Sequence, residues 1–181
     1  MIISLEEEKK CIIFCTLPHK NRIENLTVMW YTQFMDFGIT GKEKGENVYY
    51  SIQWSPLALA ERWTINSSVP AIAGIYEIYW MDDHNHLRLL AIGRTHYGGL
   101  RSEIRRLTDP ELVQDAKTRE TLENEEIWFR YTPSNSKDVM SDVVWFFRQT
   151  YFPENPGVEH SGRFKHIYIK ESAPDKLIWV P

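Results

Sequence analysis

Hydrophobic and polar residues alternate along several short runs of this chain, and such alternation is typical of half-buried β-strands. Isoleucine, tyrosine and tryptophan, which favour strands, are frequent in the same runs. The pattern predicts strands over residues 47–54, 73–80, 87–93, 127–131 and 166–170. Residues 82–86 (DDHNH) are polar and turn-prone, so we expect the strands on either side to form a β-hairpin with its loop at residues 81–86.

Helical spacing follows the second strand of this hairpin. After a pair of glycines, apolar residues recur three and four positions apart, at Leu100, Ile104 and Leu107. Residues 111–126 form a polar stretch that also suits a helix, and residues 136–151 carry an apolar stripe with Asp138 and Asp142 together on another face. This mixed order of strands and helices predicts an α+β fold.

The first 68 residues are harder to interpret. An aromatic-rich run at 26–37 precedes a glycine-rich and charged segment at 38–46, which is typical of an exposed turn, and the strand at 47–54 follows. We expect these strands to pair as an antiparallel meander. Ser55 and Pro56 fit the N-cap and first position of a short helix that continues through residues 57–62. The many aromatic residues indicate that this segment packs against the rest of the chain.

Composition sets limits on function. With 181 residues and 43% hydrophobic content, the chain can bury a substantial core, so one domain with an N-terminal extension is expected. A net charge of −4 argues against a surface that coats nucleic acid everywhere. Residues 88–106, however, contain five arginines and a single acid, Glu103. This local basic patch is either a phosphate-binding site or an ordinary solvated helix face.

The first ten residues contain charges where a secretory signal would need an apolar core, and no apolar run approaches transmembrane length. We therefore expect a cytoplasmic protein that does not enter a membrane.

One ordered set of residues suggests a family. Gly74-Ile75-Tyr76 lies on the first hairpin strand and Ala91-Ile92-Gly93 on the second, with Thr95 two positions later. Arg101 comes ten positions after Ala91, and Asp142 in the later helix is followed by Asn155 between two prolines. This order resembles the core of the GIY-YIG nuclease family over residues 70–157. The resemblance implies a small antiparallel or mixed sheet flanked by helices at residues 69–170, with residues 1–68 as a β-rich extension packed on it and 171–181 as a tail.

The resemblance also implies a chemistry, Mg²⁺-dependent hydrolysis of DNA by an endonuclease. Tyr76 would act as the base or position the water, Arg101 would hold the phosphate, and Asp142 would bind the metal. Arg94 and Arg105 would add contacts to nucleic acid. Supporting positions would be Gly74, Gly93, Thr95 and Asn155.

Two positions depart from the family pattern. Ala91 replaces the first tyrosine of the second motif and removes a hydroxyl, while Asp142 replaces a glutamate and is one methylene shorter. Two functions therefore remain open. The chain is either a divergent endonuclease or a catalytically inactive domain that binds nucleic acid or a protein partner through its aromatic and basic surfaces.

Overall fold

The computed structural model describes residues 12–15, 37–84, 86–154, 157–175 and 177–180, and for 12–15 and 177–180 the backbone alone. Expected features that fall elsewhere, among them Asn155 and the aromatic run at 26–36, lie outside the described residues. The described chain folds into two β-sheets with helices, and this confirms the predicted α+β class. No helix within the described part is long and apolar enough to cross a membrane.

The larger sheet has six strands in the order β4-β7-β5-β6-β1-β9. Its centre is the predicted hairpin, in which β5 (Gly74–Met81) pairs antiparallel with β6 (His86–Thr95). On its other side, β5 pairs antiparallel with β7 (Ile127–Pro133). The outer strands are β4 (Ala58–Leu59), β1 (Ile12–Cys15) and β9 (Leu177–Val180).

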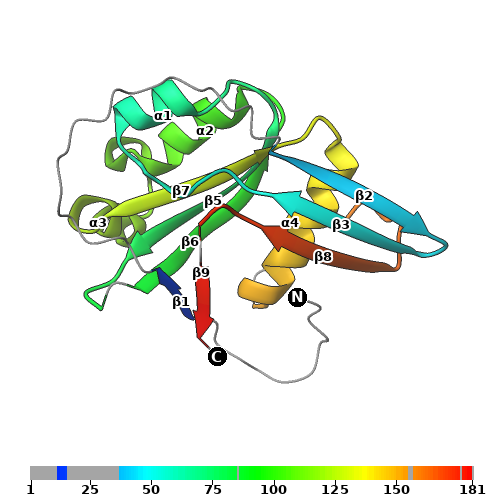
Figure 1. Ribbon diagram of the computed structural model, residues 1–181. Helices are drawn as coiled ribbons and strands as arrows, with labels where there is room; N and C mark the ends of the chain where they lie inside the picture. Colours follow the sequence, from blue (N-terminus) through cyan, green and yellow to red (C-terminus); the bar gives the residue numbers. More distant parts are fainter. Residues whose placement is uncertain (1–11, 16–36, 85, 155–156, 176, 181) are drawn as a thin grey trace, which may run out of the picture.

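Three helices, α1 (Arg62–Ser68), α2 (Gly99–Thr108) and α3 (Ala116–Asn124), lie along one side of the six-stranded sheet (Figure 1). A short 3-10 helix, Pro110–Leu112, connects α2 to α3. Tyr76 and Ile78 of β5 pack against Leu100 and Ile104 of α2 in one buried cluster. The helical stripe predicted from sequence is therefore the face that α2 buries.

The smaller sheet has three strands, with β3 (Asn47–Gln53) between β2 (Gly38–Lys44) and β8 (His166–Ser172). Helix α4 (Lys137–Tyr151) packs between this sheet and the larger one. Their shared cluster includes Val48 and Ile52 of β3, Ile75 of β5 and Phe147 of α4. Because neighbouring side chains of a strand face opposite ways, Ile75 and Tyr76 contribute to different clusters.

Several sequence-based expectations for residues 38–68 need correction. Most of the segment taken for an exposed turn is strand β2, and the turn is confined to Gly45 and Glu46. Ser55 does not cap a helix, because its hydroxyl accepts a hydrogen bond from the Tyr131 backbone N–H at 3.0 Å. Helix α1 begins only at Arg62. The strands also do not form a simple antiparallel meander, since β3 pairs in parallel with β8.

Candidate functional site

Tyr76 lies at the centre of the region that the family resemblance singles out. Its side chain is buried and its hydroxyl donates to Glu103 Oε1 at 3.4 Å, a long hydrogen bond from β5 to α2. Gly93 sits directly opposite, and a Cβ there would approach the Tyr76 hydroxyl oxygen to 2.3 Å. Burial, reinforced by the Glu103 carboxylate, raises the pKa of Tyr76. At neutral pH this hydroxyl therefore keeps its proton and acts as a donor.

Arg101 and Glu103 leave α2 in different directions. Two positions along a helix correspond to about 200°, so their side chains lie on opposite sides of it. Glu103 faces Tyr76 and is ion-paired with Arg106, with a distance of 2.6 Å between Arg106 Nη2 and Glu103 Oε1. The Arg101 Nε atom donates to the Val69 carbonyl at 2.7 Å, next to the end of α1. The structure therefore does not bring Arg101 and Tyr76 together at one point.

Asp142 is fully buried and belongs to the other side of the sheet. Tyr50 on β3 donates its hydroxyl to Oδ2 at 2.8 Å, and the backbone N–H of Ser161 donates to Oδ1 at 2.7 Å. Both oxygens thus connect α4 to the smaller sheet and to the loop before β8. This environment does not fit the expected Mg²⁺ site, which needs oxygens open to a hydrated ion. Within the described residues, no three His, Cys, Asp or Glu side chains gather in a way that could hold a metal ion.

A basic pocket forms instead at the end of β6, where the chain turns toward α2. Arg94, His96, Tyr97, Lys137 and Met140 line this pocket, which has a volume of about 290 Å³. The Arg94 guanidinium donates to the Ser141 hydroxyl on α4, which orients it across the gap between β6 and α4. Tyr97 is 92% exposed, so its ring and hydroxyl are open to solvent.

The loop that carries Tyr97 is held by two local features. The Thr95 hydroxyl donates to the Tyr97 carbonyl at 3.1 Å. Gly98 and Gly99 then adopt φ angles of 85° and 74°, a region that favours glycine, and lead directly into α2. At Gly99 a Cβ would also come within 2.7 Å of the Ala71 backbone. Thr95, which the resemblance marks as supporting, thus fixes the turn beside the pocket.

The other residues predicted for the site, Arg105 and Gly74, lie outside this pocket. Arg105 is half-buried on α2, one turn after Arg101. Gly74 lies where a Cβ would meet the Thr132 carbonyl oxygen at 2.5 Å, so it permits close approach of β5 and β7. Within the described part of the chain, Arg94, Arg101 and Arg105 form no ion pair with a carboxylate.

His96, Tyr97 and Lys137 were not predicted as site residues. The two residues after Thr95 are adjacent in sequence to the motif and could have been selected as its loop. Lys137 is different, because it reaches the pocket only through the packing of α4 against β6, where α4 begins after the N-cap Ser136. Sequence spacing gives no signal for that contact.

A buried charge network lies on the α4 side of the larger sheet and was also missed. The Arg130 guanidinium on β7 donates to Glu77 on β5 and to Glu171 on β8, the latter at 2.9 Å. Its centre lies 4.5 Å from the ring centroid of Trp54, and Trp54 Nε1 also donates to Glu171 at 2.8 Å. The network therefore joins the two sheets through one buried guanidinium.

A family model described as "Uncharacterised protein" matches residues 38–181, which covers most of the chain. The chain therefore belongs to that family. Neither the curated proteins nor the solved structures gave a match. The matched region starts at strand β2, so it includes the smaller sheet, all the helices of the described chain and every described strand of the larger sheet except β1.

Proposed function

We propose that this protein binds DNA through its phosphate backbone, at the pocket formed by Arg94, His96, Tyr97 and Lys137. The observation that supports the proposal is the meeting of two cations from separate elements, Arg94 from β6 and Lys137 from α4, beside an exposed tyrosine. Neither cation is ion-paired with a carboxylate of the described residues.

The chemistry of the pocket suits a phosphate group. Arginine presents a planar set of donors that matches phosphate oxygens, and lysine adds a point charge. The pocket also lies at the first turn of α4, where the helix dipole favours an anion, although the Ser136 hydroxyl already accepts from the Val139 N–H. The Tyr97 hydroxyl can donate a further hydrogen bond to the backbone, as tyrosines do in protein–DNA contacts.

The geometry favours a protein that binds DNA without hydrolysing it. Tyr76 retains its proton at neutral pH, and both Asp142 oxygens accept hydrogen bonds inside the protein. The groups that would prepare the water and hold the metal therefore lie apart and are engaged with other residues.

The proposal is tested by fluorescence anisotropy with a labelled 20-base-pair duplex at low salt. Replacing both pocket cations, Arg94→Ala with Lys137→Ala, should weaken binding and reduce the slope of log K against log salt by about 1.8, which corresponds to two lost phosphate contacts. Arg88→Ala is the matched control, since Arg88 is exposed toward the opposite end of β6 and is paired with Asp82. Absence of duplex binding by the wild type, or equal loss in the control, would contradict the proposal.

An endonuclease is the second candidate, and one contact favours it: Glu103 offers a carboxylate 3.4 Å from the Tyr76 hydroxyl, in the place expected for Asp142. Nicking of supercoiled plasmid, measured with and without Mg²⁺, separates the two functions. A nuclease of this kind should lose nicking in both Tyr76→Phe and Glu103→Gln, whereas Asp142→Asn should act mainly on stability. A protein that binds the duplex without nicking supports the binding function alone.

A further inference from the structure

The outer face of the smaller sheet carries an unusual combination of side chains. The register aligns three rows across β2, β3 and β8. The rows are Lys44, Asn47 and His166; Lys42, Tyr49 and Tyr168; and Thr40, Ser51 and Lys170. We call these nine residues the outer sheet face. None of them is acidic, although the whole chain has a net charge of −4.

Two tyrosines stand at the middle of this face. The rings of Tyr49 and Tyr168 stack with 4.8 Å between their centroids and 10° between their planes. That distance matches the spacing of adjacent strands, so the rings stand side by side across the sheet. Tyr49 is 44% exposed and Tyr168 is 39% exposed. One face of each ring stacks against the other tyrosine, so the second face of each ring can stack against a further aromatic group.

These tyrosines are not needed to fill the core. The opposite face of the same strands supplies Val48, Tyr50, Ile52 and Ile167 to the cluster around α4. Strand alternation therefore directs Tyr49 and Tyr168 toward solvent, where large aromatic side chains are normally few. The tyrosines and their neighbours border a groove of about 460 Å³.

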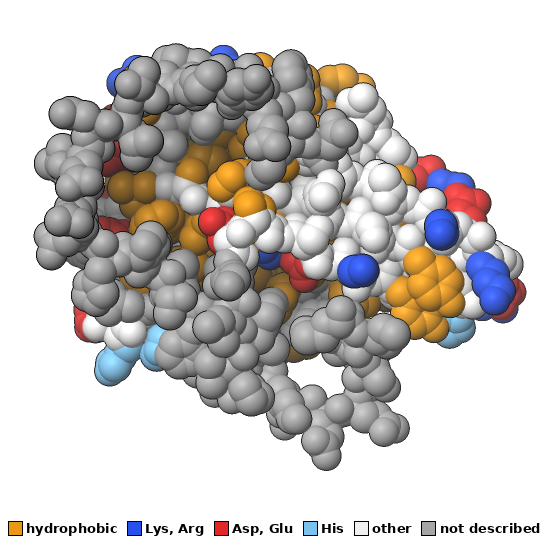
Figure 2. Space-filling model, in the orientation of Figure 1, with side chains coloured by type: hydrophobic (Ala, Val, Ile, Leu, Met, Phe, Trp, Pro, Cys, Tyr) orange, Lys and Arg blue, Asp and Glu red, His pale blue; other side chains and the backbone are white. Residues whose placement is uncertain are grey.

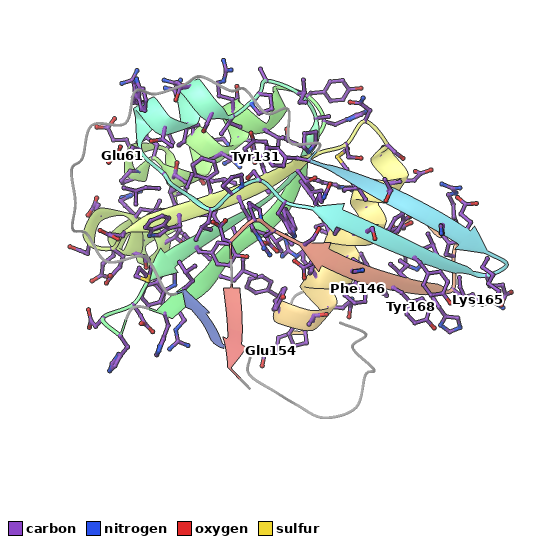
Figure 3. All side chains as sticks on the ribbon, viewed as in Figure 1. Glu61, Tyr131, Phe146, Glu154, Lys165 and Tyr168 are labelled. Carbon is purple, nitrogen blue, oxygen red and sulfur yellow. The ribbon has the colours of Figure 1, made fainter. Side chains whose placement is uncertain are left out.

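The charges around the groove are of one sign. Lys42 lines it beside Tyr49 in the middle row, and Lys170 lines it from the next row, two positions after Tyr168 on β8. The acids within these strands or at their turn are ion-paired. Glu43 pairs with Arg163, Glu46 with Lys165, and Glu171 with Arg130. Figure 2 shows a hydrophobic patch with basic side chains and a histidine beside it at this end of the molecule, and acidic side chains toward the outer edge. Figure 3 labels Tyr168 and Lys165 there.

We propose that the outer sheet face binds single-stranded nucleic acid, with bases stacked on Tyr49 and Tyr168 and phosphates held by Lys42 and Lys170. Exposed aromatic rings on a positively charged surface are the combination that single strands require, because an unpaired base has two free faces and its phosphates carry negative charge. In a duplex, the faces of each base are already stacked against neighbouring bases and cannot stack on the tyrosines. This surface is separate from the Arg94 pocket and does not depend on it.

The test compares a labelled single-stranded 12-mer, an abasic 12-mer with the same backbone, and a duplex, each in an anisotropy titration. The wild type should prefer the single strand to the abasic strand. Tyr49→Thr with Tyr168→Thr should weaken single-strand binding at least about 10-fold. Threonine is β-branched and favours β-strands, so β3 and β8 should still form in this variant. Tyr49→Phe with Tyr168→Phe should bind as the wild type does. Lys42→Ala with Lys170→Ala should reduce the salt slope by about 1.4.

Several outcomes overturn the proposal. One is equal affinity for the abasic strand, and another is unchanged single-strand binding by the folded threonine variant. A reversible dimer of the wild type that Tyr168→Thr dissociates, seen by sedimentation without single-strand binding, would assign the face to a second copy of the chain. The Arg94→Ala, Lys137→Ala variant keeps the two proposals distinct, because it should lose duplex binding and retain the difference between single-stranded and abasic oligonucleotides.

Discussion

Arg130 is the residue whose surroundings place the strictest demand on the fold. It is buried between Glu77 and Glu171, and its guanidinium lies over the Trp54 ring. Burial, together with the charge of Glu77, raises the pKa of Glu171. The pKa of Glu171 is therefore higher in the folded than in the unfolded state. Its contribution to stability is complete at a pH below the unfolded-state pKa, and it is lost as pH rises through the folded-state pKa.

This network leads to a pair of contrasting variants. Arg130→Met leaves two buried carboxylates without their cation, so it should lower the free energy of unfolding by about 3–5 kcal/mol at pH 7. The loss should shrink as pH falls, since protonation of the carboxylates removes the uncompensated charge. Glu171→Gln should cost little or stabilise the protein at pH 7, and its stability should vary less with pH. Urea unfolding at several pH values measures both, and an Arg130→Met loss that is independent of pH would be the contrary result.

Individual residues also show what sequence spacing could and could not predict about the site. Gly93 and Tyr76 lie opposite each other, as the hairpin predicted from sequence allows, because they belong to its two paired strands. Asp142 was expected beside them, but the helix that carries it presents Asp142 to Tyr50 and Ser161. An amphipathic pattern identifies which side of a helix is apolar, yet it does not say which sheet that side will face.

At the scale of elements, the β5–β6 hairpin depends on the acid at its turn. Asp82 accepts hydrogen bonds from the backbone N–H groups of His84 at 3.0 Å and His86 at 2.8 Å, and from Arg88 Nε at 2.9 Å. Burial opposes ionisation of Asp82, but these donors outweigh it and lower its pKa to about 2. The contribution of Asp82 to folding stability is therefore present at a pH above its unfolded-state pKa of 3.8, and it is lost as pH falls toward 2.

Asp82→Ala should accordingly destabilise the protein by about 1–3 kcal/mol at pH 7, through loss of hydrogen bonds to a charged acceptor. The difference from the wild type should diminish as pH falls through the window between 3.8 and about 2. Asp83→Ala is the control, because Asp83 is exposed in the same turn. Equal effects of the two substitutions in urea melts would show that the turn is held by something other than Asp82.

The sequence pattern predicted the long strands well, because β3 buries one face and β5 and β7 are buried along most of their length. The least accurate predictions fell at residues 38–62, where Gly38, Gly41 and Gly45 suggested a turn although only Gly45 has a positive φ. Gly41 in β2 serves packing instead, since a Cβ there would lie 3.0 Å from the Tyr50 ring, whereas a Cβ at Gly38 would meet nothing within 4 Å. Parallel pairing of β3 with β8 has no local signal in either strand.

At the scale of the whole molecule, residues 38–68 are part of the core. They supply β2, β3, β4 and α1, and Val48, Tyr50, Ile52 and Trp54 lie in the cluster that α4 shares with both sheets. A chain that starts at Ser68 should therefore show no cooperative thermal unfolding and should expose the apolar side of α4. A chain that starts at residue 37 keeps these elements and the full family match and should unfold cooperatively, at a lower temperature because β1 is missing. Cooperative folding from Ser68 would contradict this assignment.

The family resemblance pointed to one residue of the proposed Arg94 pocket and to none of the outer sheet face. Arg94 was predicted from its place after Gly93, and it does line a basic pocket. The outer sheet face could not be predicted, because its rows combine residues 40–51 with residues 166–170 through a pairing of distant strands. Each strand shows the alternation that marks its exposed positions, but only the fold places Tyr49 beside Tyr168.

The pairing of β3 with β8 also has a consequence during synthesis on the ribosome. Ser172 and Ile52, which share a hydrogen bond across this pair, are 120 positions apart in the chain. At typical translation rates the hairpin β2–β3 emerges on the order of ten seconds before α4 and β8 can cover it. During that interval Val48, Tyr50 and Ile52 form an uncovered apolar strip with a free strand edge beside it, which is the kind of surface that nascent-chain chaperones shield. The translation rate of the codons for residues 53–166 thus determines how long the β2–β3 hairpin is exposed before α4 and β8 are synthesised.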